Sequence, residues 1–252
     1  MTENPDHGLD PVSPAPKQKG PFGCGTLVIV CGIGVVLVAF LLPALRRGAP
    51  EAARQAQCKN NLKNIALALY NYEAEYHSLP PAYTIDAQGK PLHSWRTLIL
   101  PYLDQKPLYT TIDLSKPWDD PANADAVKQR VSIFHCPDDT GLQNHTTYLA
   151  CVASNGCFRL TEPRRFSEIT DGLAETLMVI EVPADRSVPW MSPNDADESL
   201  IMSIGPESKL AHAGGMSIAF CDGRVRFVSA NIPAALRRAL ISIAGGEQVG
   251  DF

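Results

Sequence analysis

The chain has 252 residues, a formal net charge of −5 and seven cysteines. The mild acidity argues against nucleic acid as a partner, because proteins that bind DNA or RNA usually present a basic face. The sequence contains no GxSxG nucleophile motif, no phosphate-binding P-loop and no GxGxxG dinucleotide motif. We therefore expect a protein without enzymatic activity and without a cofactor.

An apolar run over residues 26–45 contains no charged residue. A helix needs roughly 20 apolar residues to cross a bilayer, and the run is longer than the apolar core of a typical cleaved signal peptide. The residues before it are rich in proline and carry scattered charge, which is typical of a disordered tail. We expect a cytoplasmic tail over 1–21, a transmembrane helix over 22–45 and one domain over 46–252.

Residues 51–78 are predicted to form an amphipathic helix. Pro50 and Glu51 suit its start, because proline loses no hydrogen bond in the first turn and an acidic side chain interacts favourably with a helix N-terminus. Pro80 and Pro81 require the helix to end before them. Apolar side chains recur at three- and four-residue steps and form one stripe: Leu62, Ile65, Ala66, Leu69, Tyr72 and Tyr76.

The rest of the chain alternates short apolar segments with turns. The clearest unit is a C-terminal hairpin over 216–229, where two alternating runs flank Asp222-Gly223, a strong hairpin signal. We further predict a hairpin or loop over 82–92, helices over 95–103, 123–130 and 233–243, strands over 133–136, 146–152 and 176–182, and loops over 106–122 and 183–210.

His212 and Asp222 invite a catalytic or metal-binding interpretation, but the pattern favours a structural one. Asp222 and Gly223 stand at a turn, where Asp-Gly is preferred for its backbone conformation. His212 precedes the hairpin, and we expect its ring to hydrogen-bond to the backbone. No metal site is predicted, because the loop acids lack EF-hand spacing. Zinc spacing is also absent around the metal-competent residues His135, Cys136, Asp138, Asp139 and His145.

Several short segments occur in a specific order along the chain. They cover residues 54–68, 93–96, 100–105, 116–119, 136–139 and 147–150, and His212 then precedes Asp222-Gly223 with nine residues between. This ordered set, over roughly residues 40–246, resembles a bacterial prepilin-like family that is abundant in planctomycetes, the domain of unknown function family 1559.

The resemblance implies an α+β fold of the type IV pilin or pseudopilin type. In such a fold a long N-terminal helix, with a transmembrane half and an amphipathic half, packs on an antiparallel sheet in an extracytoplasmic domain. Arg46 and Arg47 would by themselves favour a cytoplasmic domain, so the orientation follows from the resemblance alone. Family members usually carry a glutamate soon after a cleavable glycine, and none follows Gly20 here. We therefore expect an uncleaved single-pass anchor in the inner membrane.

Five cysteines follow the apolar run. Cys58 and Cys136 lie in segments that match the family, and we favour a disulfide between them that ties the helix to the first strand of the sheet. Cys151 and Cys157 flank a short turn, and a second disulfide would close a small hairpin there. The alternative is that all five cysteines are buried thiols.

The family resemblance implies a pseudopilin-like structural or assembly protein of the cell envelope. Its partners would be the lipid bilayer and other pilin-like subunits or envelope proteins. The alternative is an anchored extracytoplasmic binding module, in which the loop over 183–210 and Trp190 present a site for a saccharide or a peptide. A tryptophan in such a loop is more often a packed anchor than a ligand-binding residue, and we favour that interpretation of Trp190.

Overall fold

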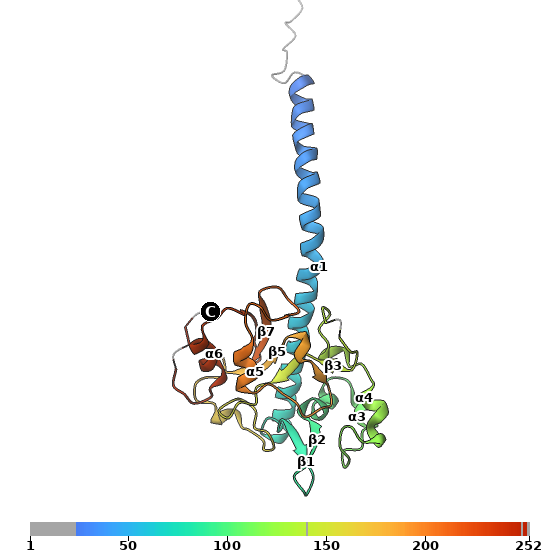
Figure 1. The fold of residues 1–252 in the computed structure, drawn as a ribbon, viewed down its shortest axis with the longest axis vertical. Coiled ribbons are helices and arrows are strands. Elements are labelled where there is room, and N and C mark those ends of the chain that lie inside the picture. Colours follow the sequence, from blue (N-terminus) through green and yellow to red (C-terminus); the bar gives the residue numbers. More distant parts are fainter. Residues whose placement is uncertain (1–23, 140, 248, 251–252) are drawn as a thin grey trace, which may run out of the picture. The chain divides into compact units, whose positions relative to one another are not determined.

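A computed structural model describes residues 50–139, 141–247 and 249–250, and it assigns residues 24–49 to a helix without describing their side chains (Figure 1). The chain divides into two compact units, 1–49 and 50–252, and the second is called the domain below. The predicted tail and transmembrane segment lie outside the described residues. Within the part of the chain that is described, no helix combines the length and the apolar character needed to cross a membrane.

Helix α1 (Cys24–Tyr76) supplies one wall of the domain core. The predicted apolar stripe is the buried face, and Leu62, Ile65 and Leu69 have no exposed surface. The helix ends before the two prolines, as predicted. His77 then adopts a positive φ of 58°, and its N–H donates to the carbonyl of Glu73 at 2.7 Å. This left-handed residue closes the last helical turn.

A four-stranded antiparallel sheet forms the centre of the domain, in the order β4-β5-β7-β8. Alternate residues of the strands face opposite sides, so the sheet has two apolar faces. One packs against α1, and the other packs against α5 (Glu198–Ser203) and α6 (Ala234–Ile241). The strands are β4 (Tyr148–Ala150), β5 (Leu177–Glu181), β7 (Gly215–Phe220) and β8 (Val225–Ser229).

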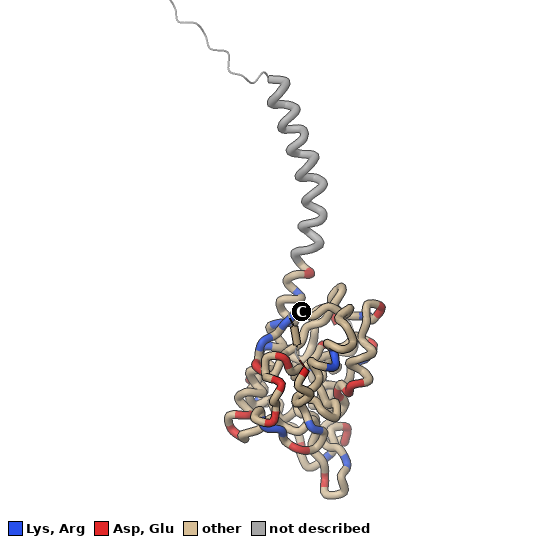
Figure 2. Tube along the Cα trace, turned by 90° about the vertical axis from the view of Figure 1, so that its left-hand side faces the viewer, with Lys and Arg blue, Asp and Glu red and all other residues tan. Residues whose placement is uncertain are grey.

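Smaller elements surround this sheet. β1 (Tyr83–Ile85) pairs with β2 (Pro91–Ser94), and β3 (His145–Thr146) pairs with β6 (Val188–Pro189), both antiparallel. Acidic and basic residues are interspersed over the described domain (Figure 2). The remaining helices are α2 (Trp95–Leu98), α3 (Lys106–Tyr109) and α4 (Ala124–Val127), with 3-10 turns at Leu100–Tyr102, Pro121–Asn123, Ser132–Phe134, Phe166–Glu168 and Ala184–Arg186.

The predicted α+β class with an antiparallel sheet is confirmed, and the C-terminal hairpin is present as β7 and β8. The strand predicted over 133–136 is wrong, because the N–H of Phe134 donates to the carbonyl of Val131 and coils this segment into a 3-10 turn. The helix predicted over 95–103 is divided at Ile99, since Pro101 has no N–H to continue it.

The segment 183–210, predicted as a loop, contains β6 and α5 and is held by a buried ion pair. Arg96 and Asp195 are in contact at 2.7 Å with no more than 1 % of either side chain exposed. Trp190 has only 1 % of its surface exposed, and its Nε1 donates to the carbonyl of Gln129 at 3.0 Å. Trp190 is therefore a packed anchor and does not offer its ring to a ligand.

Candidate functional site

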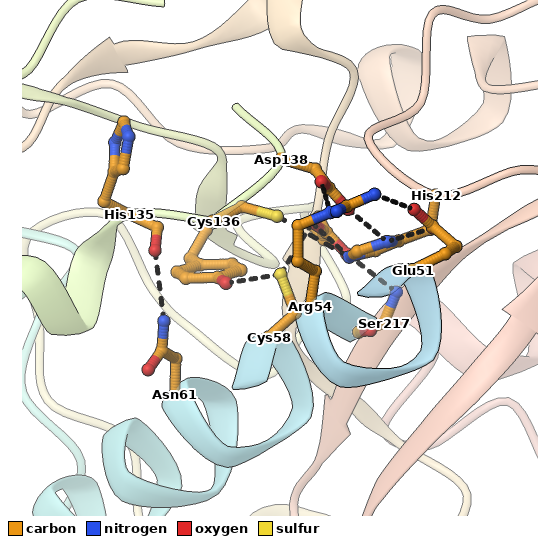
Figure 3. A network of polar contacts seen from close by, with 11 residues as sticks. Glu51, Arg54, Cys58, Asn61, His135, Cys136, Asp138, His212 and Ser217 are labelled. Carbon is orange, nitrogen blue, oxygen red and sulfur yellow. Dashed lines mark hydrogen bonds and ion pairs between the residues drawn. The ribbon is translucent and has the colours of Figure 1, made fainter. Parts of the chain in front are cut away.

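Four metal-competent side chains meet between α1 and the sheet (Figure 3). They are Cys58, Cys136, Glu181 and His212, called the buried cluster below, and none has more than 1 % of its surface exposed. One donor atom from each lies within 4.8 Å of the donor atoms of the other three. Such a grouping of thiols, a carboxylate and an imidazole has the composition of a metal site or of a polar core network.

Each member of the buried cluster comes from a different element. Cys58 lies on the buried stripe of α1, one turn before Leu62. Glu181 is the last residue of β5, and His212 precedes β7, where it forms a β-bridge with Gly215. Cys136 follows the 3-10 turn at Ser132–Phe134, a segment that Asn61 of α1 fixes by donating from Nδ2 to the carbonyl of His135 at 3.1 Å.

Short polar contacts connect the four donor atoms. Cys58 Sγ donates to Glu181 Oε1 at 3.3 Å, Cys136 Sγ lies 3.6 Å from His212 Nε2, and His212 Nε2 lies 3.8 Å from Glu181 Oε1. Tyr148 and the main chain of Ser217 add donors, since the Tyr148 hydroxyl reaches Cys58 Sγ at 3.0 Å and the Ser217 N–H reaches Glu181 Oε2 at 3.2 Å.

The other ring nitrogen of His212 faces two carboxylates. Its Nδ1 lies 3.1 Å from Glu51 Oε1 and 3.2 Å from Asp138 Oδ2. Arg54 joins the same group, because its guanidinium bonds to Glu51 at 2.8 Å and contacts Asp138. These partners hold the ring in one orientation, with Nδ1 toward the carboxylates and Nε2 toward the thiols.

Burial and mutual charge shift the pKa values inside the cluster. Burial, followed by the charge of Cys136, raises the pKa of Glu181 to about 8. Burial acts to lower the pKa of His212, but hydrogen bonding with Cys136 and the charge of Glu181 outweigh it and raise that pKa to about 9. Hydrogen bonding from Cys58, and then from His212, lowers the pKa of Cys136. Cys136 Sγ and His212 Nε2, 3.6 Å apart, therefore each favour the charged form of the other.

A family model for a protein of unknown function, DUF1559, matches residues 47–203. This segment is more than half of the chain. The chain belongs to the DUF1559 family. Searches of curated proteins and of solved structures found no match. Three members of the buried cluster, Cys58, Cys136 and Glu181, lie inside the matched segment of this DUF1559 chain, and His212 lies beyond it.

The DUF1559 domain separates the two residues of the predicted histidine-aspartate motif. His212 joins the buried cluster, and its ring contacts side chains, not the backbone as expected. Asp222 lies in the turn two residues beyond the far end of the six-residue strand β7, and its Oδ1 accepts from the N–H of Arg224 at 2.9 Å. Gly223 has a φ of +82°, which suits a glycine in the turn.

The five described cysteines are all free and buried thiols. Neither predicted disulfide is formed: Cys58 and Cys136 instead share the buried cluster, and Cys157 Sγ accepts from Cys221 Sγ at 3.0 Å. Cys58 and Cys136 nevertheless lie close together, as the predicted disulfide between them requires.

The segment from His135 to His145 contributes fewer side chains to the site than its metal-competent composition suggests. The ring of His135 points away from the cluster in Figure 3, and His145 contacts Ser187 at 3.3 Å. Asp139 accepts from the N–H of Gly141 at 2.8 Å. Of the described residues in this segment, only Cys136 and Asp138 have side chains that reach the site. Sequence reasoning missed Glu51 and Glu181, because neither stands at a recognisable ligand spacing from the others.

Proposed function

We propose that this DUF1559 protein is a membrane-anchored, pilin-like structural or assembly subunit of the cell envelope, with its domain on the extracytoplasmic side. One observation carries the proposal: the C-terminal half of α1 is a core element of the domain, and the same helix, which begins at Cys24, includes the apolar run. A helix that is both a potential anchor and a wall of the core is the arrangement expected of a pilin-like subunit.

The buried cluster favours a non-enzymatic role. A substrate must reach the reacting groups, and none of the four side chains exposes more than 1 % of its surface. The proposed partners are therefore the lipid bilayer and other pilin-like subunits or envelope proteins. On α1, Leu67 and Tyr76 expose more than half of their surfaces and are available for contact with such a protein.

Cell fractionation tests the anchor and its orientation. We expect the full chain in the membrane fraction, and a variant lacking residues 26–45 in the soluble fraction. Protease added to spheroplasts should digest the domain, whereas a cytoplasmic domain would be protected. A full chain that remains soluble would exclude the anchor, and a protected domain would reverse the orientation.

Photo-crosslinking in the membrane tests assembly. A photoreactive residue in place of Leu67, which is 59 % exposed, should form adducts with another copy or with a second envelope protein. The same residue in place of Ile85, which lies on β1 and is 43 % exposed, serves as the control position. Monomers alone at both positions would contradict an assembly role.

A further inference from the structure

We propose that Cys58, Cys136, Glu181 and His212 bind one divalent metal ion of the zinc class and form a closed structural site that holds α1 against the sheet. The inference does not depend on membrane anchoring, because all four residues belong to the domain. It assigns a metal to a protein whose sequence spacing predicts none.

The donor set suits zinc. Thiolate sulfur, imidazole nitrogen and carboxylate oxygen are the ligands that zinc takes in proteins, and four protein ligands without an open position are typical of structural sites. Calcium and magnesium prefer sites made of oxygen atoms, which this cluster is not. Two thiolates, one carboxylate and a neutral imidazole around a dication carry a formal charge of −1, as does a site of three cysteines and one histidine.

The spacing of the donor atoms fits one central ion. With metal–sulfur bonds of about 2.3 Å and metal–nitrogen or metal–oxygen bonds of about 2.0 Å, tetrahedral ligands lie roughly 3.3–3.8 Å apart. The three edges that join Cys58 to Glu181, Cys136 to His212 and His212 to Glu181 measure 3.3, 3.6 and 3.8 Å. The other three distances among the four donor atoms are at most 4.8 Å, so the ligands can close around one ion by small movements.

The surroundings of the cluster orient it for a metal. Metal-binding histidines usually donate their second ring N–H to a carboxylate, which leaves the other nitrogen free to bind. His212 has this arrangement, with Nδ1 against Glu51 and Asp138 and Nε2 directed into the cluster. The N–H of Ser217 holds Glu181 Oε2, which leaves Oε1 on the side of the thiols.

A metal would also resolve an electrostatic imbalance. Three carboxylates, from Glu51, Asp138 and Glu181, surround the imidazole of His212, and Arg54 pairs only with the first two. Glu181 is buried, and among the described ion pairs His212 at 3.8 Å is its only cationic partner. A buried carboxylate needs stronger compensation than one distant imidazole provides. A dication at the centre would neutralise it, and both sulfur atoms would bind as thiolates.

Cobalt substitution on the full-length protein tests the proposal. The chain is purified in mild detergent under reducing conditions, treated with a chelator and titrated with Co²⁺. We expect saturation at one ion per chain, with visible bands of tetrahedral cobalt and a near-ultraviolet band from thiolate-to-cobalt charge transfer. Zn²⁺ should displace the cobalt and bleach both bands. This readout on the unmodified chain needs no variant to fold.

Matched variants locate the ion. Cys58→Ser and His212→Gln should each weaken cobalt binding by at least about tenfold, because each removes one ligand. Cys157→Ser and Cys221→Ser are the controls, since both thiols are equally buried but lie outside the cluster. These controls should bind cobalt like the unmodified chain.

Three results would overturn the proposal. One is a chain that binds no stoichiometric cobalt or zinc after reduction. Another is cobalt bound without the thiolate band, or bound equally well by Cys58→Ser. The third is a Cys58–Cys136 disulfide peptide as the dominant species in protein isolated with its thiols alkylated at lysis, since a disulfide would consume two of the four ligands.

Discussion

The side chain of Arg96 donates five hydrogen bonds. Its Nε donates to the carbonyl of Trp190 at 2.8 Å, and its Nη2 donates to the carbonyls of Ser192 and Asn194 at 3.0 and 2.9 Å. Its Nη1 pairs with Asp195, whose Oδ1 also accepts from the Trp95 ring. A single charged side chain therefore fixes the course of the buried segment after β6.

Replacing Arg96 should be among the most damaging single substitutions. Arg96→Met leaves Asp195 buried without its cation, and breaking one side of such a pair costs about 3–5 kcal/mol. Urea denaturation followed by tryptophan fluorescence measures the loss. Arg159→Met is the control, because the ion pair of Arg159 with Glu168 is partly exposed and is worth about 1 kcal/mol or less. Equal losses for the two variants would contradict the argument.

His93 makes stability depend on pH. Burial lowers the pKa of its imidazole, although the carbonyls of Lys116 and Asp113 partly oppose this effect. Nε2 lies 2.7 Å from the Lys116 carbonyl, and the buried Nδ1 has no hydrogen-bond partner. A second proton on the ring would place an unpaired donor in the interior.

Because the folded pKa of His93 lies below the unfolded one, the unfolded chain binds the proton more readily. The contribution of His93 to stability is thus present above about pH 6.5 and is lost as the pH falls below it, by at most about 1.4 kcal/mol per pH unit. His93→Gln lacks this dependence. The free-energy difference between the two proteins, measured from about pH 8 to pH 5, should shift in favour of the variant. Parallel profiles would show that His93 does not titrate in this way.

At the scale of elements, α1 packs against the domain core through one face. Leu69 is fully buried, whereas Leu67, two residues earlier, is 59 % exposed. The two leucines differ in environment but share the helix and the residue type. Substituting each in turn therefore distinguishes the effect of packing from that of helix propensity.

Leu69→Ala should destabilise the domain by about 2–5 kcal/mol, because it removes core contacts and leaves a cavity. Leu67→Ala should change stability by less than about 0.5 kcal/mol. Denaturation midpoints of the two variants measure the difference. Similar losses would mean that α1 packs through a different face.

The elements that the sequence predicted well are those with a strong local pattern. The stripe of α1 repeats over several turns, and Asp222-Gly223 marks the final hairpin. The apolar pair Ile133 and Phe134 is too short to distinguish a strand from a turn, and it was misassigned. The buried cluster was not predicted because its four residues come from separate segments of the chain. Glu181, in addition, ends a strand that otherwise consists of apolar residues.

At the scale of the molecule, residues 50–252 form a compact unit with its own core. Residues 51–76 of α1 belong to that core, although the helix begins in the other unit. The boundary of a stable fragment should therefore fall inside the helix and not at its end.

A fragment of residues 50–252 should fold, remain monomeric and unfold cooperatively. A fragment of residues 77–252 should not, because it lacks the α1 face that covers one side of the sheet. Circular dichroism melting curves and size-exclusion chromatography measure both. Aggregation of the longer fragment, or a cooperative transition in the shorter one, would refute this division.

The Tyr70 hydroxyl donates to the carbonyl of Cys221 at 2.5 Å, across 151 positions of the chain. The ribosome makes α1 first, and the sheet that it packs against is completed only when β7 and β8 follow β4 and β5. At roughly 5–20 residues per second, this delay lasts about 8–30 s. During that time the sheet that covers the leucines of α1 is incomplete, so part of their apolar surface stays exposed on the nascent chain. Ribosome-bound chains that stop before β7 should remain sensitive to protease. Full-length chains joined to a C-terminal linker that places β8 outside the ribosome should become resistant.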